Sequence, residues 1–429
     1  MSIRILLIQP PIHDFCAYDF WLKPYGLLRV AGMLRGQARM DLFDFLDRGD
    51  EGMACDGKLR GDRWGRGAFR RELLPKPAAL KDIPRRFYRF GLPREVFRAF
   101  LVSRGSYDVA LIQSGMTYWY PGVRETIEEI RRRSPDTRIV LGGVYATLCP
   151  EHAATLGADL VIRGNDLQPL WTLLGIVPPP EAPAFWEGYA RLRSGALKLS
   201  DGCPFRCTYC ASDRLHGGFS PRRLQTAMAE VHALAVRGVR DIAFYDDALL
   251  HRAEETLLPF LEQAPREGEP LRFHTPNAVH ARFITADLAC RMAAGGFRTF
   301  YLGLESASAQ WQAATGRKVT VGEFRQAVAY LREGGAGEIH AYVLLGHPSG
   351  DPESVSAALS LARELGVRAM LADFSPVPGT PDGDACASRV DLGEPLNHNK
   401  TAYPIRAWGA QTVNRLKAQC RTARSGHAS

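Results

Sequence analysis

The chain has 429 residues, of which 46% are hydrophobic and 23% charged, and it carries a formal net charge of +8. This length and composition predict a globular protein of two or three domains. No apolar run approaches ~20 residues and the N-terminal MSIRILLIQPP lacks a signal-peptide cleavage site, so neither a membrane span nor a secretion signal is expected. We therefore expect a cytoplasmic protein, in which clustered cysteines bind metal or perform chemistry.

Residues 1–176 alternate apolar strands with amphipathic helices, a pattern typical of a parallel sheet covered on both faces. The sequence therefore predicts a doubly wound, Rossmann-like α/β domain, whose ligand binds beyond the carboxyl ends of the strands. The predicted strands are RILLIQ (4–9), MDLFDFLD (40–47), DVALIQS (108–114), RIVLGG (138–143) and ADLVIRG (158–164). The loops after them, rich in glycine and aromatic residues and suited to a broad ligand, include 9–15, 114–122, 142–147 and 163–166.

A basic insertion at residues 56–106 interrupts this domain. It holds 14 Lys and Arg against 5 Asp and Glu, a surplus that accounts for the whole net charge. Arginines mixed with Phe, Tyr and Trp can serve RNA or a phosphate-bearing ligand. We favour the alternative interpretation, a solvated helical insertion whose aromatic side chains pack on the host domain.

The second half of the chain repeats a β/α unit six times. VPPPEAP (177–183) breaks the periodicity and predicts an interdomain linker over residues 177–194. Repeated β/α units beyond it predict a (β/α)6 partial TIM barrel over residues 195–385. A C-terminal extension, 386–429, follows, and we expect its end to be disordered. The six predicted strands are 196–200, 241–247, 271–277, 299–306, 338–346 and 370–377.

A segment of eight residues, 203–210, follows the first barrel strand and contains three cysteines. Cys203, Cys207 and Cys210 form a C-x3-C-x2-C array, with Tyr209 directly before the third cysteine. A structural zinc site takes a closed set of four ligands, whereas a [4Fe–4S] cluster held by three thiolates keeps one iron open for a substrate or cofactor. The array therefore predicts such a cluster. Polar residues expected at the same mouth of the barrel are Asp246, Asp247, Asn277, Glu305, Ser306 and His347.

With this array inside a β/α barrel, the sequence resembles the radical S-adenosylmethionine (SAM) superfamily. The resemblance implies that the open iron binds the amino and carboxylate groups of SAM, whose cleavage yields a 5′-deoxyadenosyl radical. The matching stretches are DIAFYDD, YLGLES, VLLGHPSGD and FSPVPGTP. By position they imply Asp246 or Asp247 for the SAM ammonium group, Glu305 and Ser306 for its ribose or amino acid part, and Leu345, Gly346, Pro376 and Val377 for adenine, with Tyr209 nearby.

Placed before such a barrel, the N-terminal domain resembles the cobalamin (B12)-binding domain of the B12-dependent radical SAM class. The D-x-H-x-x-G motif that supplies a histidine to cobalt is absent, since His13 is followed by Asp14, Phe15 and Cys16. We therefore predict no histidine on cobalt, with Tyr118 or Trp119 shielding its lower face. RGND stands where relatives often have Gly-Glu-Gly-Glu. The implied cobalamin contacts are Pro10, Ser114, Met116, Thr117, Tyr118, Trp119, Gly142, Gly143, Val144, Tyr145, Gly164 and Asn165.

The resemblance implies an enzyme that uses a [4Fe–4S] cluster, SAM and cobalamin, with an external electron donor of flavodoxin or ferredoxin type and no nucleic-acid partner. The expected reaction is methylation of an unactivated carbon of a small or medium-sized metabolite. Cyclisation or rearrangement without methyl transfer is the alternative. A tRNA methylthiotransferase would need a second cluster, for which Cys16, Cys55 and Cys149 are present without the usual motifs. A non-catalytic corrin- or cluster-binding protein is the remaining alternative.

Overall fold

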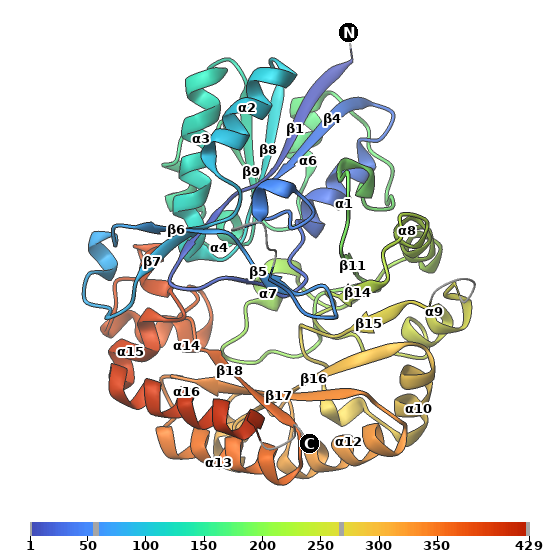
Figure 1. Ribbon diagram of the computed structural model, residues 1–429, viewed down its shortest axis with the longest axis vertical. Helices are drawn as coiled ribbons and strands as arrows, with labels where there is room; N and C mark the ends of the chain where they lie inside the picture. The colour runs from blue at the N-terminus through green and yellow to red at the C-terminus, as the bar shows by residue number, and fades with distance from the viewer. Residues whose placement is uncertain (1, 55–59, 266–269, 426–429) are drawn as a thin grey trace. The chain divides into compact units, whose positions relative to one another are not determined.

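The computed structural model describes residues 2–54, 60–265 and 270–425. The chain forms two compact units (Figure 1). Unit 1 comprises residues 1–81, 85–196 and 232–239, and unit 2 comprises residues 82–84, 197–231 and 240–429. None of the helices in the described ranges combines the length and the hydropathy that a membrane span requires.

Unit 1 is built on a five-stranded parallel sheet in the order β10-β9-β8-β1-β4. Alternate residues of a strand point to opposite faces, and both faces of the central strands are buried, which explains their continuous apolar sequence. The predicted doubly wound fold is confirmed. Its strands are β1 (Ile3–Gln9), β4 (Ala38–Asp44), β8 (Val109–Ser114), β9 (Arg138–Gly143) and β10 (Leu160–Val161).

Helices pack on this sheet through apolar stripes. Leu27 of α1 (Tyr25–Met33) and Leu170 of α6 (Gln168–Leu174) belong to one core cluster with Ile5, Leu7 and Leu111. These three strand residues share one face of the sheet, because they occupy alternate positions. Residues 177–194 continue from α6 and pack on α1, since the Phe185 amide donates to the Leu28 carbonyl at 2.9 Å. Further helices of this unit are α2 (Arg94–Arg104), α3 (Tyr120–Arg133), α4 (Val144–Leu148) and α5 (Pro150–Ala154).

Helix α2 is the longest element of the basic insertion, but strands, turns and loops make up most of its described part, so the prediction of a helical insertion was only partly right. An antiparallel sheet in the order β2-β7-β6 pairs the insertion with the loop after β1, and helix α2 alone follows the helical prediction. The predicted aromatic anchors are present: Phe87 and Phe90 of β7 are 2% and 3% exposed. Residues 56–59 of the insertion lie outside the described residues. The strands are β2 (Ile12–Asp14), β5 (Gly67–Ala68), β6 (Arg71–Leu74) and β7 (Phe87–Phe90), and β5 pairs with β3 (Tyr18–Asp19).

The second sheet has six strands in the order β11-β14-β15-β16-β17-β18. Spatial order therefore follows chain order, as in a barrel of β/α units, and the predicted partial barrel is confirmed. Its strands are β11 (Gly195–Leu197), β14 (Asp241–Phe244), β15 (Arg272–His274), β16 (Phe297–Glu305), β17 (Glu338–Leu345) and β18 (Arg368–Asp373).

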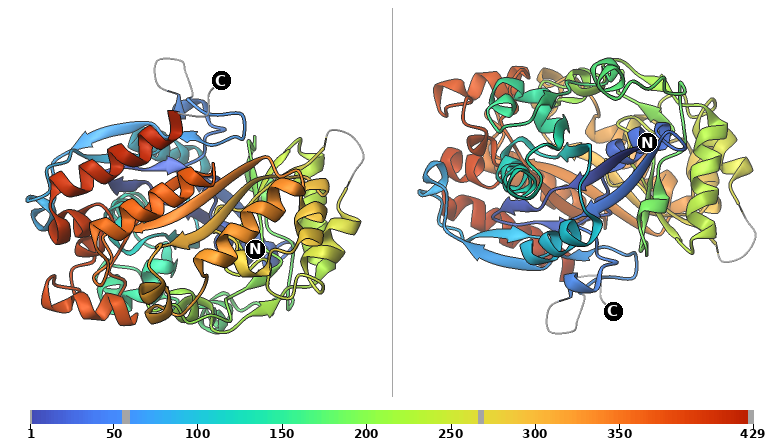
Figure 2. Two further views of the ribbon diagram at one scale, coloured as in Figure 1. Left: turned by 90° about the horizontal axis from the view of Figure 1, so that it is seen from below. Right: turned by 90° about the horizontal axis from the view of Figure 1, so that it is seen from above.

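Helices line one side of this sheet, as Figures 1 and 2 show. They are α10 (Ala286–Ala294), α12 (Val321–Glu333), α13 (Pro352–Glu364) and α16 (Ala410–Ser425). Helix α16 packs on α13 and β18, and the Lys417 ammonium lies 2.6 Å from the Asp373 carboxylate of β18. The C-terminal segment thus adds a helix to the barrel edge. The disorder predicted for the chain end falls on residues 426–429, outside the described residues.

Candidate active site

The cysteine loop is closed at its neck by a short antiparallel pair. Strand β12 (Ser200–Asp201) pairs with β13 (Ser220–Pro221), so residues 202–219 form one loop. Gly202 has a φ of +74°, and a Cβ at this position would lie 2.4 Å from the Gly218 carbonyl oxygen. Only glycine fits such a close approach of two backbone segments. The fold therefore presents the three cysteines on a loop with fixed ends.

The three thiols of this loop are free and partly accessible. Cys203 and Cys207 are half-buried, Cys210 is exposed, and the Cys210 amide donates to the Cys207 carbonyl at 3.0 Å. Burial raises the pKa of Cys203 to about 11 and also raises the pKa of Cys207, so metal binding would have to displace protons. Within the described residues, no three His, Cys, Asp or Glu side chains converge as ligands of a single metal ion. Thiols spaced apart in one loop fit a cube better, because each thiolate then binds a different iron.

Asp246 is one of the two predicted SAM contacts after β14, and its carboxylate is hydrogen-bonded to backbone amides. Its carboxylate is 3% exposed and accepts hydrogen bonds from the amides of Leu199 and Ser200, at 3.0 and 2.7 Å, and from the Ser200 hydroxyl. Burial raises the pKa of Asp246 to about 6 despite these donors. The side chain thus ties the end of β14 to the start of the cysteine loop, and has little capacity left for a ligand.

Asp247 has the opposite environment. Its Oδ2 atom is buried and accepts no hydrogen bond, with the Lys198 ammonium at 3.6 Å and the His216 ring at 3.8 Å. His216 belongs to the cysteine loop, so Asp247 lies against this loop, and its charge adds to the effect of burial in raising the pKa of Cys203. A buried carboxylate oxygen that lacks a donor is satisfied when a cationic ligand binds. The structure therefore separates two adjacent residues that the sequence could not distinguish.

A second charged pair lies near the same loop. Strand β16 ends at Glu305, with a φ of +61°, and the Lys318 ammonium lies 3.2 Å from its Oε1 atom. The pair covers Gly303, where a Cβ would lie 2.8 Å from the Lys318 nitrogen. Burial opposes the charge of Lys318, but Glu305, followed by Cys207 and Cys210, raises its pKa. This lysine is therefore a cation beside the candidate cluster.

Lys318 was not predicted from the sequence. It follows Glu305 by 13 residues, in the stretch TGRKVT, where no helical or strand periodicity marks its position. The nearby backbone explains its placement, since Gly316, with a φ of +105°, lies against Cys207, where a Cβ would be 3.1 Å from the Cys207 Cα. A basic residue beside a glycine turn is too common a signal to have identified it.

The remaining predicted SAM contacts also lie at strand ends of unit 2. Leu345 is fully buried. Gly346 has a φ of +83° and lies against Pro404, because a Cβ at this position would be 2.5 Å from the proline ring. Beyond β18, Pro376 is buried and Val377 half-buried, and the Val377 carbonyl accepts from the Thr380 hydroxyl at 2.8 Å. The chain thus turns directly after β17, at Gly346, and after β18, at Val377.

Ser306, Asn277 and Tyr209 complete the set. Ser306 is 8% exposed and its carbonyl accepts from Gln312 Nε2 at 2.7 Å. The Asn277 amide donates to the Tyr245 carbonyl at 2.8 Å, which joins the ends of β15 and β14. The ring of Tyr209 stacks on Trp311, with ring centroids 5.8 Å apart. The structure thus brings the polar residues of several strand ends to the same edge of unit 2 as the cysteine loop.

In unit 1, the ends of β8 and β9 pack closely together at Ser114, Gly142 and Gly143, and we call this backbone segment the shelf. The Ser114 hydroxyl donates to the Gly142 carbonyl at 2.7 Å and accepts from the Ala146 amide at 3.1 Å. Gly143 has a φ of +99°, and a Cβ there would lie 2.3 Å from the Ser114 carbonyl oxygen. The Gly164 amide donates to the Thr147 hydroxyl at 2.9 Å and so connects a third strand end to this shelf.

The side chains predicted to contact cobalamin differ sharply in accessibility. Met116 is 47% exposed, whereas Tyr118 is 1% exposed and packs inside the unit. Trp119 is half-buried and its indole N–H donates to the Asp14 carboxylate at 2.9 Å. Asn165 and Gly143 are exposed and Val144 is half-buried, while Pro10, Thr117 and Tyr145 are buried. Met116, Asn165 and Gly143 are thus the exposed residues of this predicted set.

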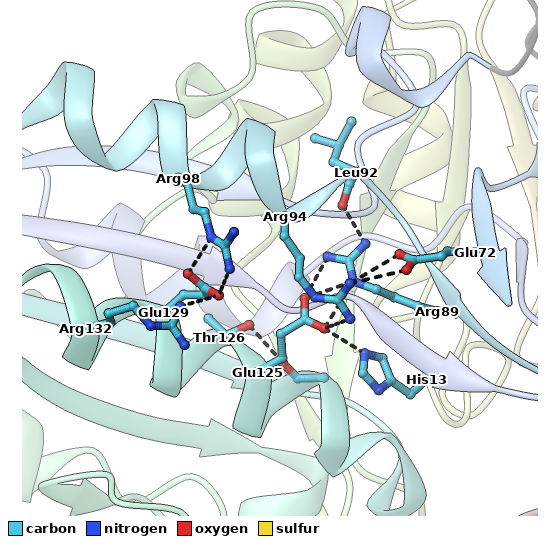
Figure 3. A network of polar contacts seen from close by, with 11 residues as sticks. His13, Glu72, Arg89, Leu92, Arg94, Arg98, Glu125, Thr126, Glu129 and Arg132 are labelled. Atoms are coloured by element: carbon cyan, nitrogen blue, oxygen red, sulfur yellow. Dashed lines mark hydrogen bonds and ion pairs between the residues drawn. The ribbon is translucent and has the colours of Figure 1, made fainter. Parts of the chain in front are cut away.

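His13 belongs to a buried charge network, drawn in Figure 3. Its Nε2 atom lies 3.0 Å from the Glu125 carboxylate of α3, which also receives Arg89 and Arg94 from the insertion at 2.8 and 2.9 Å. Burial opposes ionisation of Glu125, but the hydrogen bonds from His13 and Arg89 lower its pKa to about 2. His13 is 8% exposed and therefore held as a partner of this carboxylate.

Several cations of the basic insertion are neutralised within unit 1. Besides the two arginines on Glu125, Arg98 makes two hydrogen bonds to Glu129, at 2.9 and 2.6 Å (Figure 3). Arg66 pairs with Asp62 at 2.6 Å. Paired arginines contribute less to binding a nucleic-acid backbone, because their charge is already compensated.

Residues 197–371 of the chain match the radical SAM superfamily. The chain carries a radical SAM domain. The match spans the barrel and the cysteine loop, and such a domain uses SAM and a [4Fe–4S] cluster, as the cysteine array predicted. An uncharacterised methyltransferase of Pyrococcus horikoshii is 27% identical over 191 residues, which are 43% of this chain and 40% of that protein. The threonylcarbamoyladenosine tRNA methylthiotransferase MtaB of Thermotoga maritima is 24% identical over 318 residues, 68% of this chain and 70% of MtaB.

Two solved structures share the fold over nearly the whole chain. TsrM from Kitasatospora setae, a radical SAM methyltransferase solved with cobalamin and a [4Fe–4S] cluster, has a TM-score of 0.63 at 16% identity, covering 98% of this chain and 91% of TsrM. The cobalamin-dependent radical enzyme OxsB, solved with aqua-cobalamin and SAM, has a TM-score of 0.58 at 11% identity, covering 98% of this chain and 61% of OxsB. At these identities the likeness establishes the fold.

Proposed function

We propose that this radical SAM enzyme is a cobalamin-dependent methyltransferase acting on an unactivated carbon of a small or medium-sized metabolite. The observation that carries the proposal is that charges of both signs lie around one loop with three thiols. Asp247, whose buried Oδ2 atom accepts no hydrogen bond, lies 3.8 Å from His216 of this loop, and the half-buried Lys318 follows Gly316, which lies against Cys207. SAM carries an ammonium and a carboxylate group on one carbon. The charges around the loop complement both groups.

In this proposal the residues of unit 2 bind and orient SAM. Cys203, Cys207 and Cys210 hold three irons, Asp247 accepts the SAM ammonium group, and Lys318 compensates the SAM carboxylate. Glu305 keeps Lys318 in place through their 3.2 Å contact. When bound, the cluster and SAM supply a 5′-deoxyadenosyl radical and cobalamin supplies a methyl carrier, while the protein supplies binding and orientation.

The cobalamin part of the proposal rests on the shelf in unit 1 and on the fold shared with TsrM and OxsB. Glycine backbone at Gly142 and Gly143 leaves room for a broad, flat ligand beyond the strands. Of the side chains in the loop after β8, Met116 is the exposed one, so we place it under cobalt in preference to Tyr118 or Trp119. Met116 would then offer cobalamin a soft thioether and no ring nitrogen.

A tRNA methylthiotransferase is the main alternative, favoured by the similarity to MtaB. It would need a second cluster on N-terminal cysteines. Cys16 is exposed, but Cys149 is 8% exposed, so its thiol is less accessible to an iron atom than the half-buried and exposed thiols of the 202–219 loop. Cys55 lies outside the described residues. Iron analysis separates the two proposals, with about four irons per chain expected here and about eight for two clusters.

Two further alternatives concern the reaction itself. A cyclisation or rearrangement would use the same SAM-binding residues without methyl transfer, and a non-catalytic corrin- or cluster-binding protein would cleave no SAM. We retain methylation because TsrM and OxsB, which share the fold over nearly the whole chain, were solved with cobalamin and TsrM is a methyltransferase. An external one-electron donor of flavodoxin or ferredoxin type and a small-molecule substrate are the expected partners.

Electron paramagnetic resonance (EPR) of the bound cobalt(II) form tests the cobalamin proposal. We expect the wild type to retain cobalamin on gel filtration and to show no nitrogen superhyperfine splitting. Replacing Met116 by histidine should introduce that splitting if this side chain lies under cobalt. His13→Gln is the matched control, and it should leave the spectrum unchanged because His13 is held by Glu125. Nitrogen splitting in the wild type that His13→Gln removes would show that His13 is the ligand.

A further inference from the structure

A hydrogen-bonded clamp holds the middle of the cysteine loop at Thr208, the residue directly after Cys207. The Thr208 hydroxyl donates to the Asp382 carboxylate in α14 (Pro381–Asp384), and the Asp382 amide donates back to the Thr208 carbonyl at 3.1 Å. The Thr208 amide donates to the Thr315 carbonyl at 3.4 Å. Thr208 is therefore held at its side chain and at both backbone groups by segments far away in the sequence.

His347, the second residue after β17, orients the Asp382 carboxylate. Its Nε2 atom lies 2.9 Å from the same Asp382 oxygen that accepts from Thr208. Its Nδ1 atom accepts from the Trp311 indole N–H and from the Ser349 amide, both at 3.2 Å. Indole and amide N–H groups only donate, so Nδ1 carries no proton and Nε2–H donates to Asp382. The ring thus holds one tautomer and one orientation.

Aromatic packing joins this clamp to Tyr209. The His347 ring meets Trp311 edge-on, with centroids 5.0 Å apart, and meets Phe374 at the same distance. Trp311 in turn stacks on Tyr209, the residue that separates Thr208 from Cys210 in the sequence. His347 is 1% exposed, so these contacts exclude water from the hydrogen bonds and strengthen them. The ends of β17 and β18 therefore reach the cysteine loop through one continuous set of contacts.

We propose that Asp382 and His347 are positioning residues that fix Thr208 and, with it, the Cys207–Cys210 half of the candidate cluster site. The inference rests on the proposed function, since it assigns these residues a role toward the cluster. Both residues reach the loop through Thr208, and the Asp382 carbonyl also accepts a hydrogen bond at 3.1 Å from the thiol of Cys386, which lies outside this loop. They act through the loop backbone, as partners behind metal ligands commonly do, and the loss of such partners costs about 10- to 100-fold in metal affinity.

The test uses substitutions at Thr208 in the full-length, anaerobically reconstituted protein. Thr208→Val keeps the side-chain shape and both backbone hydrogen bonds but removes the hydroxyl that donates to Asp382. Thr208→Ser keeps the hydroxyl and is the conservative rescue. Asp382→Ala removes the acceptor, and Asp384→Ala, an exposed carboxylate of the same helix that contacts the Gly379 amide, is the control for damage to α14.

Two readouts are measured: the rate of iron release to a chelator, and the EPR spectrum of the reduced cluster with and without SAM. We expect Thr208→Val and Asp382→Ala to release iron on the order of tenfold faster and to give altered SAM-bound spectra. Thr208→Ser and Asp384→Ala should match the wild type. Wild-type iron-release rates and spectra in Thr208→Val would overturn the inference. Iron release from Thr208→Ser as fast as from Thr208→Val would also overturn it.

The outcomes also separate this inference from the function on which it rests. A wild type that assembles no cluster would refute the proposed function. The second outcome is a wild type that holds a stable cluster whose iron-release rate and spectrum are unchanged in Thr208→Val and Asp382→Ala. That result would refute the clamp alone. Should Thr208→Val fail to fold, Asp382→Ala decides the matter, because it leaves the cysteine loop sequence intact.

Discussion

Replacing Cys203, Cys207 and Cys210 together by alanine will leave a folded protein that holds no four-iron cluster. The three thiols lie on a loop whose ends are held by β12, β13 and Gly202, and two of them are only half-buried while the third is exposed. Their removal therefore opens no core cavity. Iron should fall from about four per chain to background, together with the broad visible absorbance of the cluster.

The measurement is iron and sulfide analysis beside the circular dichroism spectrum and the melting temperature. Cys290→Ala is the control, because Cys290 is an exposed thiol on α10, away from the loop. It should retain full iron, an unchanged melting temperature and full SAM cleavage. A triple variant that keeps wild-type iron and sulfide loading would refute the assignment of the cluster to this loop.

Asp247→Asn will weaken SAM binding by about 100-fold while the cluster and the fold persist. The variant removes the charge that we assign to the SAM ammonium group, and losing one partner of a buried charge pair costs roughly 2–5 kcal/mol. Asp247 ties no backbone segment through its Oδ2 atom, which accepts no hydrogen bond. Titration of SAM into the reconstituted protein, followed by EPR of the reduced cluster, measures the effect.

Asp246→Asn is the matched comparison, and it will act on stability instead. An amide NH2 in place of one carboxylate oxygen would face the Leu199 amide, which now lies 3.2 Å from Asp246 Oδ2. Two opposed donors leave a buried group unsatisfied, at a cost of about 1–3 kcal/mol. The melting temperature should therefore fall, with SAM affinity less affected. Lost SAM binding in Asp246→Asn at unchanged stability, with normal binding in Asp247→Asn, would reverse the two roles.

The central strands of both sheets could be predicted because they are continuous apolar runs buried on both faces. RILLIQ and DVALIQS became neighbouring strands of unit 1, and EIHAYVLLG became β17 of the barrel. The cysteine array was equally accessible, since its ligands are local in sequence and their spacing carries the chemistry. These features need no knowledge of long-range contacts.

The features that escaped prediction depend on partners far away in the chain. Strand β7 pairs with β2, more than 70 residues earlier, so a short segment of alternating Phe, Tyr and Arg gave no clear strand signal. Lys318 reaches Glu305 through a glycine turn, and Asp382 reaches Thr208 across 174 positions. Asp246 and Asp247 are adjacent, yet only the three-dimensional structure reveals which carboxylate the backbone has already engaged.

The most direct test of the central claim is a single-turnover product analysis of the anaerobic holoprotein with cobalamin, reductant and SAM. No substrate is needed, because methyl transfer to cobalamin releases S-adenosylhomocysteine and reductive cleavage of SAM releases 5′-deoxyadenosine. We predict both products, with S-adenosylhomocysteine levelling off at about one per bound cobalamin and 5′-deoxyadenosine absent from the triple cysteine variant. A cluster-loaded and cobalamin-loaded wild type that forms neither product would contradict the account.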